Sequence, residues 1–330
     1  MARALILSPL MGIRLEPGID RLVLGPWDDD WTVTVRAPTE ADKNLIGLHP
    51  GHAAPAGCGT IAGLRDSPLW IVIESASFPD PGDRFQAVER AEGAAATAPL
   101  YVTTALRLAA PGWTGAGPWA IVFDPDEPTR AFDIADDPWP LRPPYPLYDR
   151  GLFQRWVGPD VSWHDYELDE SVATVAPDLF AACRRPDLPE WVGRSLAHFS
   201  ESYEEHRHYP DDRLLKLMIA LEGALLPSQQ AKAKEKLAQR TAALVGAVLG
   251  GRDTRVDVRH WYDLRSEIAH GRTPGPLRSL ESEVHDLDAL VRAAMTHLAR
   301  SAPLNQKAFL SELDEAGGAK VSPSFDVQSD

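Results

Sequence analysis

The spacing of apolar residues along the chain changes near residue 186. Beyond that point apolar residues recur every three or four positions, which places them on one face of an α-helix. Proline or glycine stands where several of these runs end, at Pro227, Gly250 and Gly271. The pattern predicts five amphipathic helices with short connections, and therefore a closely packed bundle. The expected helices cover residues 188–206, 211–227, 229–249, 254–270 and 280–298.

The first half of the chain instead carries short alternating or β-branched runs separated by turn residues. These runs predict strands at 21–24, 31–35, 69–74 and 119–123. The proline-rich stretches 137–140 and 142–146 exclude regular secondary structure, because each proline removes a backbone donor and restricts the preceding residue. The expected fold class is therefore α+β, with a β-rich N-terminal domain followed by an all-α helical bundle.

The patterns divide the chain into three segments. Residues 1–183 form the β-rich domain and residues 184–300 form the bundle. Residues 301–330 hold one short helix, expected at 307–316, and a polar tail of a composition typical of flexible termini. A length of 330 residues agrees with two domains.

Cysteine usage and hydropathy indicate a cytoplasmic protein. Cys58 and Cys183 have no metal-ligand spacing around them, so we expect two reduced thiols and neither a zinc site nor a disulfide framework. No stretch reaches the roughly 18 apolar residues needed to span a bilayer. The apolar run at 4–11 is interrupted by Pro9 and lacks an export cleavage site. We therefore expect a soluble protein without a membrane partner.

Charge is distributed unevenly along the chain. The net charge of −15 disfavours contact with nucleic acid, because phosphate groups attract basic surfaces. Residues 1–183 hold 13 Lys and Arg against 26 Asp and Glu, however, whereas residues 184–300 hold 18 against 17. The segment 184–300 also carries seven of the ten histidines. It is thus compatible with a local positive patch.

The fourth expected helix contains the sequence WYDLRSEIAHG at 261–271. Arg265 and His270 are separated by four residues, Tyr262 stands three residues before an Arg-Ser pair, and a His-Gly pair closes the segment. In these features the C-terminal third of the chain resembles the Apea-like branch of the HEPN domains. Ser266 departs from the family, because many HEPN nucleases place Asn, Asp or His directly after the arginine.

The order of elements adds to the resemblance, with Glu222 and Arg240 in the two preceding helices. Active HEPN domains are metal-independent ribonucleases, so the resemblance implies an RNA endonuclease without a metal or other cofactor. It also implies a homodimer in which two copies of the motif face each other. The N-terminal domain would regulate the nuclease or sense a trigger, in antiviral defence or growth arrest. The alternative is an inactive HEPN module that serves dimerisation or ligand binding.

Metal-independent RNA cleavage needs a base for the 2′-hydroxyl proton, an acid for the 5′-oxygen and a cation for the phosphate. His270 can transfer protons near neutral pH, and Arg265 offers a fork of donors for phosphate oxygens. The helix dipole also favours a positive charge where His270 stands. On a regular helix the two side chains point about 140° apart. A distorted helix end, the length of the arginine or a second subunit must therefore complete the site.

Glu222 falls on an apolar stripe, where a carboxylate needs a partner. Arg240 on the facing helix is the expected one, in a buried ion pair that fixes helix register; a direct role of Glu222 beside His270 is the other possibility. Glu267 lies one turn before His270 and either is solvated or supports its charged form. Tyr262 is expected to pack.

A plainer interpretation exists for the motif itself. Arg265 would be a surface arginine, and His270 a helix-terminal histidine that bonds to carbonyl groups. His206 and His208 stand close together, but two histidines in an irregular segment do not define a metal site, and none is assigned.

Overall fold

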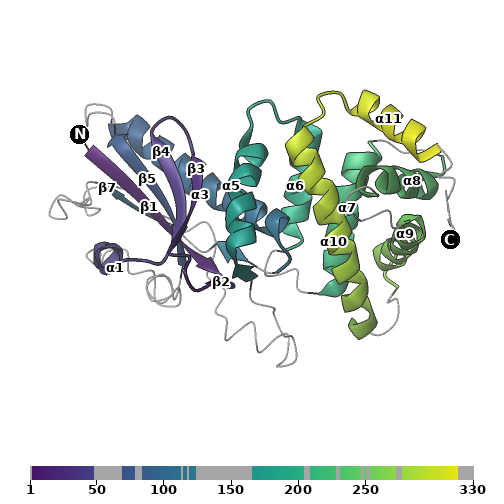
Figure 1. The fold of residues 1–330 in the computed structure, drawn as a ribbon, viewed down its shortest axis with the longest axis horizontal. Coiled ribbons are helices and arrows are strands. Elements are labelled where there is room, and N and C mark those ends of the chain that lie inside the picture. The colour runs from purple at the N-terminus through teal and green to yellow at the C-terminus, as the bar shows by residue number, and fades with distance from the viewer. Residues whose placement is uncertain are drawn as a thin grey trace, which may run out of the picture. The chain divides into compact units, whose positions relative to one another are not determined.

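The chain folds into two compact units, residues 1–186 with 203–208 and residues 187–202 with 209–330. A sheet lies in the first unit and a helical bundle in the second (Figure 1), which confirms the α+β class. Within the described residues no helix is long and apolar enough to cross a membrane. The computed structural model describes residues 2–47, 69–78, 84–112, 114–116, 119–123, 166–203, 209–227, 231–246, 249, 253–272 and 277–318.

The first unit is built on an antiparallel sheet with β1 (Ala2–Met11) at its centre. One edge of β1 pairs with β5 (Leu69–Phe78), and beyond β5 follow β4 (Trp31–Arg36) and β3 (Arg21–Pro26). β6 (Gly115–Ala116) and β7 (Ala120–Phe123) pair with the other edge of β1, and β2 (Ile13–Leu15) and β8 (Tyr166–Leu168) form a parallel pair. The four strands predicted from the sequence are confirmed as β3, β4, β5 and β7.

Two long helices of this unit were missed by the hydrophobic pattern. α3 (Arg84–Ala109) packs on β1 and β5, and α5 (Glu170–Arg184) packs on α3 and β3. The buried stripe of α3 is mostly alanine, which is too weakly apolar to stand out in the sequence, and Pro99 lies inside the helix where a proline normally marks an end. The stripe comprises Ala91, Ala94, Ala95, Ala98, Val102 and Ala105.

The first unit also contains a short helix and a buried cysteine. α1 (Glu40–Gly47) follows β4. Cys183 is a buried free thiol in α5, and burial raises its pKa to about 12. Cys58 and the proline-rich stretches 137–140 and 142–146 lie outside the described residues.

The second unit contains the five predicted helices and one more. Their apolar stripes are buried as expected; in the helix at 277–301, for example, Leu287, Val291 and Leu298 are fully buried. The bounds are α6 (Glu190–Glu201), α7 (Pro210–Leu225), α8 (Ala233–Val245), α9 (Arg255–Ala269) and α10 (Leu277–Ser301). The sequence pattern therefore located this bundle well.

The additional helix is α11 (Gln306–Gly318). The sequence predicted a short helix here but set it apart from the bundle. The structure instead packs α11 along α8 and buries Phe309, Leu310 and Leu313. α11 is thus part of the helical unit, and the expected tail, 319–330, lies outside the described residues.

Candidate active site at the end of helix α9

Helix α9 carries the motif and has a narrow contact with the bundle. It packs against α7 and α8 and fully buries Val258 and Trp261. Much of its remaining surface stays open, and Val256 is 67% exposed. A helix with so little buried surface can present several side chains to another molecule at once.

The last turn of α9 is closed by a Schellman motif, a pair of hydrogen bonds that reverses the chain. Gly271 has a left-handed backbone with φ of 72° and donates its N–H to the carbonyl of Ile268 at 2.9 Å. The N–H of Arg272 reaches the carbonyl of Glu267, also at 2.9 Å. His270 is therefore the C-cap residue and is exposed at the helix end. The predicted helix end at Gly271 is confirmed.

Replacing Gly271 with alanine should destabilise the helical unit by about 1 kcal/mol, because a left-handed backbone is costly for any residue with a Cβ atom. Chemical denaturation measures this loss. Gly193→Ala in α6 is the matched control: a Cβ atom there meets nothing within 4 Å, so the change should be neutral or mildly stabilising. An equal loss in both variants would contradict the assignment.

Arg265 is held by a carboxylate from a neighbouring helix. Its Nη2 atom donates to Oε2 of Glu222 in α7 at 3.1 Å, and the two side chains are 31% and 20% exposed. The contact satisfies neither group fully: Oε1 of Glu222 and Nε of Arg265 are buried without a hydrogen-bond partner among the described residues. Burial raises the pKa of Glu222 above its ordinary value of 4.5, and the charge of Arg265 offsets only part of that rise.

Removing Arg265 alone should destabilise the unit by about 1 to 3 kcal/mol at pH 7, because a largely buried carboxylate loses its partner. The folded state already holds the proton of Glu222 to a higher pH than the unfolded chain does, and loss of the cation strengthens this tendency. The penalty therefore grows as pH rises through the folded pKa and shrinks toward pH 4 to 5.

Chemical denaturation of Arg265→Ala and of the unchanged protein at pH 7 and at about pH 4.5 tests this dependence. Arg255→Ala, which breaks the exposed pair with Asp253, is the control and should cost little at either pH. A penalty for Arg265→Ala that does not change with pH would show that Glu222 is not its source.

The expected pair between Glu222 and Arg240 is wrong. Arg240, only 5% exposed, donates from Nε and Nη2 to the two oxygens of Asp314 in α11, each at 2.7 Å, and from Nη1 to the carbonyl of Leu225 at 2.6 Å. The sequence pattern missed this partner because α11 was set apart from the bundle. Arg240 thus ties α7, α8 and α11 together.

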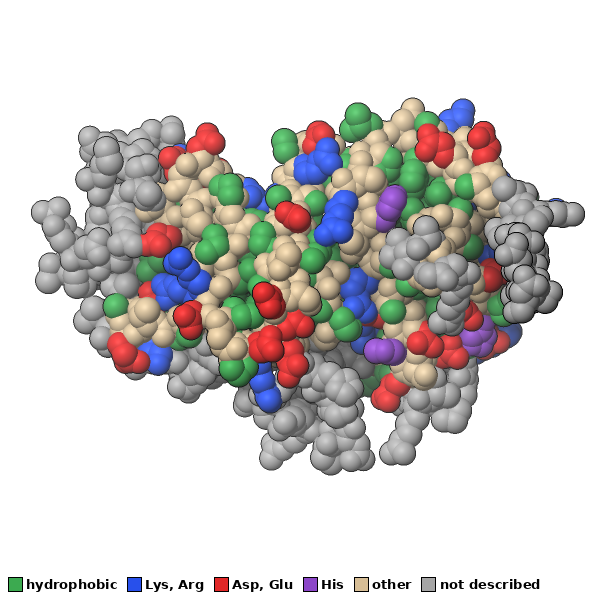
Figure 2. Space-filling view, in the orientation of Figure 1, with side chains coloured by type: hydrophobic (Ala, Val, Ile, Leu, Met, Phe, Trp, Pro, Cys, Tyr) green, Lys and Arg blue, Asp and Glu red, His purple; other side chains and the backbone are tan. Residues whose placement is uncertain are grey.

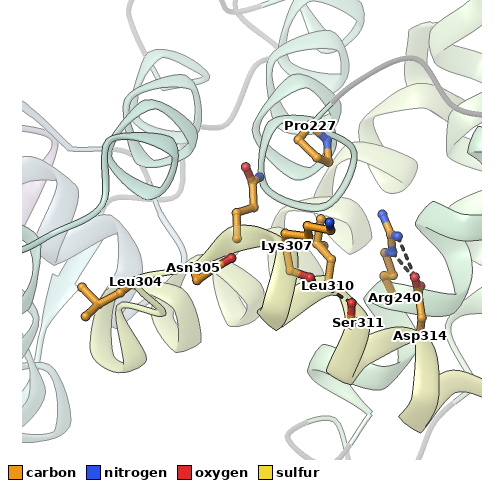
Figure 3. Close-up of a pocket in the computed structure, with 9 residues that line it drawn as sticks. Pro227, Arg240, Leu304, Asn305, Lys307, Leu310, Ser311 and Asp314 are labelled. Carbon is orange, nitrogen blue, oxygen red and sulfur yellow. Dashed lines mark hydrogen bonds and ion pairs between the residues drawn. The ribbon is translucent and has the colours of Figure 1, made fainter.

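The Arg240–Asp314 pair lines an open groove of about 630 Å³ (Figure 3). Lys307, Leu310 and Ser311 face the same groove from α11, and Pro227 lies across from them. The groove shares none of its lining residues with the motif. Arg240, predicted to support the site, therefore has a structural role in the bundle.

The other residues predicted to support the site lie on α9 itself. Tyr262 and Ser266 are half-buried, and Glu267 is exposed. The carbonyls of Ser266 and Glu267 both accept the backbone N–H of His270, at 3.2 and 3.1 Å. His206 and His208 lie outside the described residues, within which no cluster of three His, Cys, Asp or Glu side chains could hold a metal ion.

Charged side chains of both signs are mixed over the face of the protein drawn in Figure 2. Lys and Arg side chains stand there singly or in small groups, with Asp and Glu side chains elsewhere on the same face, and the described residues drawn form no single continuous basic area. Contact between this face and a nucleic acid would therefore depend on individual cations.

No protein-family model matches the sequence, and neither the curated proteins nor the solved structures include a significant match.

Proposed function

We propose that the helical unit is a metal-independent RNA endonuclease of the HEPN type, with His270 and Arg265 as its catalytic residues. The observation that supports this best is the state of His270. Its side chain is exposed at the closed end of the helix and has no hydrogen-bond or ion-pair partner among the described residues. A histidine in this state can exchange protons with a bound substrate.

The expected chemistry is an internal transfer within the RNA. His270 takes the proton of the 2′-hydroxyl, the 2′-oxygen attacks the adjacent phosphorus, and the bond from phosphorus to the 5′-oxygen breaks. A second acid returns a proton to the leaving oxygen. The products are a 2′,3′-cyclic phosphate and a 5′-hydroxyl, so no redox partner or metal is required.

Arg265 supplies positive charge to the transferring phosphate. Its Nη2 edge is used by Glu222, which fixes the direction of the side chain, while nearly a third of the side chain stays exposed. A guanidinium held in one orientation stabilises developing charge without having to reorganise. We therefore assign Glu222 as the residue that positions Arg265.

A homodimer provides the missing acid. One chain offers one exposed histidine at this helix end, whereas the reaction needs a base and an acid together. A two-fold partner would bring a second His270 to the first. The first unit, with its own sheet and core, would then act as the regulator of the nuclease or the sensor of its trigger.

One observation favours the inactive alternative, in which the helical unit serves dimerisation or ligand binding. The ion pair with Glu222 accounts for Arg265 as a structural residue without any catalytic role. Purified protein incubated with total RNA in EDTA separates the two functions. Cleavage with 2′,3′-cyclic phosphate ends supports the nuclease; intact RNA, or cleavage only with added metal, supports the alternative.

A further inference from the structure

Charged side chains on α9 fall into two groups. The charged residues before the last turn all have partners. Asp257 takes part in a polar or electrostatic interaction, and the others form ion pairs with another helix or with a neighbour in the chain. Glu267, His270 and Arg272 in the closing turn have no ion-pair or hydrogen-bond partner for their side chains among the described residues. The engaged pairs are Arg255–Asp253, Arg259–Glu235, His260–Glu283, Lys234–Asp263 and Arg265–Glu222.

The backbone brings these three residues together. Glu267 and His270 are three positions apart, so their side chains are neighbours on the helix surface. The hydrogen bond from the N–H of Arg272 to the carbonyl of Glu267 returns the chain to the same turn.

The two arginines near His270 therefore differ in availability. The charge of Arg265 is balanced by Glu222, whereas the exposed guanidinium of Arg272 has no such counter-ion among the described residues. Carbonyl groups give the C-terminal end of a helix a partial negative charge, so an RNA phosphate can approach only with the help of a nearby cation. Arg272 is the cation that the closing turn supplies.

We propose that Arg272 binds an RNA backbone phosphate next to the scissile one, before the reaction begins. Arg265 acts on the scissile phosphate in the transition state, and Arg272 holds the strand beside His270. Glu267 carries a negative charge on the same turn, so Arg272 is the cation of this turn that is available to RNA. We therefore expect the turn to make one phosphate contact. The choice of RNA as the ligand rests on the proposed nuclease function.

A direct test is binding of a single-stranded RNA oligonucleotide to the full chain, measured by fluorescence anisotropy at several salt concentrations. His270→Ala serves as the parent, so that the RNA stays intact. Losing one phosphate contact on a single strand should reduce the slope of log affinity against log salt by about 0.7. Arg272→Gln should show this reduction, and Arg272→Lys should keep the parent slope because it keeps the charge.

Arg255→Gln is the matched control, since Arg255 is on the same helix and is already paired with Asp253. Its slope should equal that of the parent. An unchanged slope in Arg272→Gln, or a slope in Arg272→Lys as low as in Arg272→Gln, would overturn the proposal. In the active chain Arg272→Gln should raise KM with little change in kcat.

The outcomes separate this inference from the proposed function. RNA binding that depends on Arg272 in a chain that never cleaves would refute the nuclease and keep the phosphate contact. Cleavage with a KM and salt slope independent of Arg272 would do the reverse. A chain that neither binds nor cleaves RNA contradicts both.

Discussion

RNA cleavage should fall at least about 100-fold when His270 is replaced by alanine, because a positioned acid or base typically contributes 10²- to 10⁴-fold. The substitution should leave the fold intact, since the ring is exposed and the Schellman motif uses only backbone atoms of this residue. Initial rates on a fluorescent RNA, together with circular dichroism of the variant, measure both effects.

His297→Ala is the matched control, because His297 is an exposed histidine on α10 of the same unit. Its activity should equal that of the unchanged protein. Mixing the unchanged protein with an excess of His270→Ala adds a test of the dimer, since a mixed dimer retains one His270 where the mechanism uses two. Loss of activity beyond simple dilution would support a shared site, and full activity of His270→Ala alone would refute the mechanism.

Substitution of Arg240 by alanine should have the largest effect on stability, about 2 to 4 kcal/mol, because it removes a buried guanidinium from a partly exposed carboxylate and leaves the carbonyl of Leu225 without its donor. Asp314 is 42% exposed, so its carboxylate tolerates the loss better than a buried group would. Replacing Arg240 by methionine and Asp314 by leucine together should cost less than the sum of the single changes.

Urea denaturation of the full chain gives these free energies. Lys307→Ala is the control and should change little, because the side chain of Lys307 lies in the same groove and makes no hydrogen bond or ion pair to a described residue. Effects of Glu222 and Arg240 substitutions should add, as expected of groups that do not meet. If the effects of the two substitutions were strongly non-additive, Glu222 and Arg240 would form the ion pair predicted from the sequence, contrary to the structure.

The arginine of this pair lowers the pKa of Asp314 through its hydrogen bonds, and this gives the groove a pH dependence. A carboxyl group with a lowered folded pKa stabilises the fold above its ordinary value of 3.8. That contribution disappears as pH falls through the folded pKa. Below this range α11 should lose part of its attachment to α8.

Much of the helical unit was predictable, because its apolar stripes are long and regular. Leu287, Val291 and Leu298 specify α10 from the sequence alone, and Gly271 specifies the end of α9 through a local backbone requirement. The pairing of charges was not predictable. Glu222 and Arg240 stand opposite each other in the pattern, yet each finds its partner on another helix, since register and rotation between helices depend on the whole core.

In the first unit the reason for failure was different. Strands β3, β4, β5 and β7 have β-branched alternation and were found. α3 was missed because its buried face is mostly alanine. Small side chains let neighbouring elements approach closely, but alanine is only weakly apolar, so a hydropathy pattern does not mark this face as buried. Arg272 was missed because the sequence does not show which charged side chains form ion pairs. Only the structure shows that the cations of α9 are paired and that Arg272 has no ion-pair partner among the described residues.

The C-terminal end of α7 depends on residues far along the chain. The side-chain amide of Gln306 donates to the carbonyls of Gly223 and Ala224, which precede it by 83 and 82 positions, and Arg240 supplies the donor for Leu225. The carbonyl groups of this last turn therefore gain all their hydrogen-bond donors only when α11 has docked. Substitutions at Gln306 should consequently speed unfolding and leave the folding rate almost unchanged.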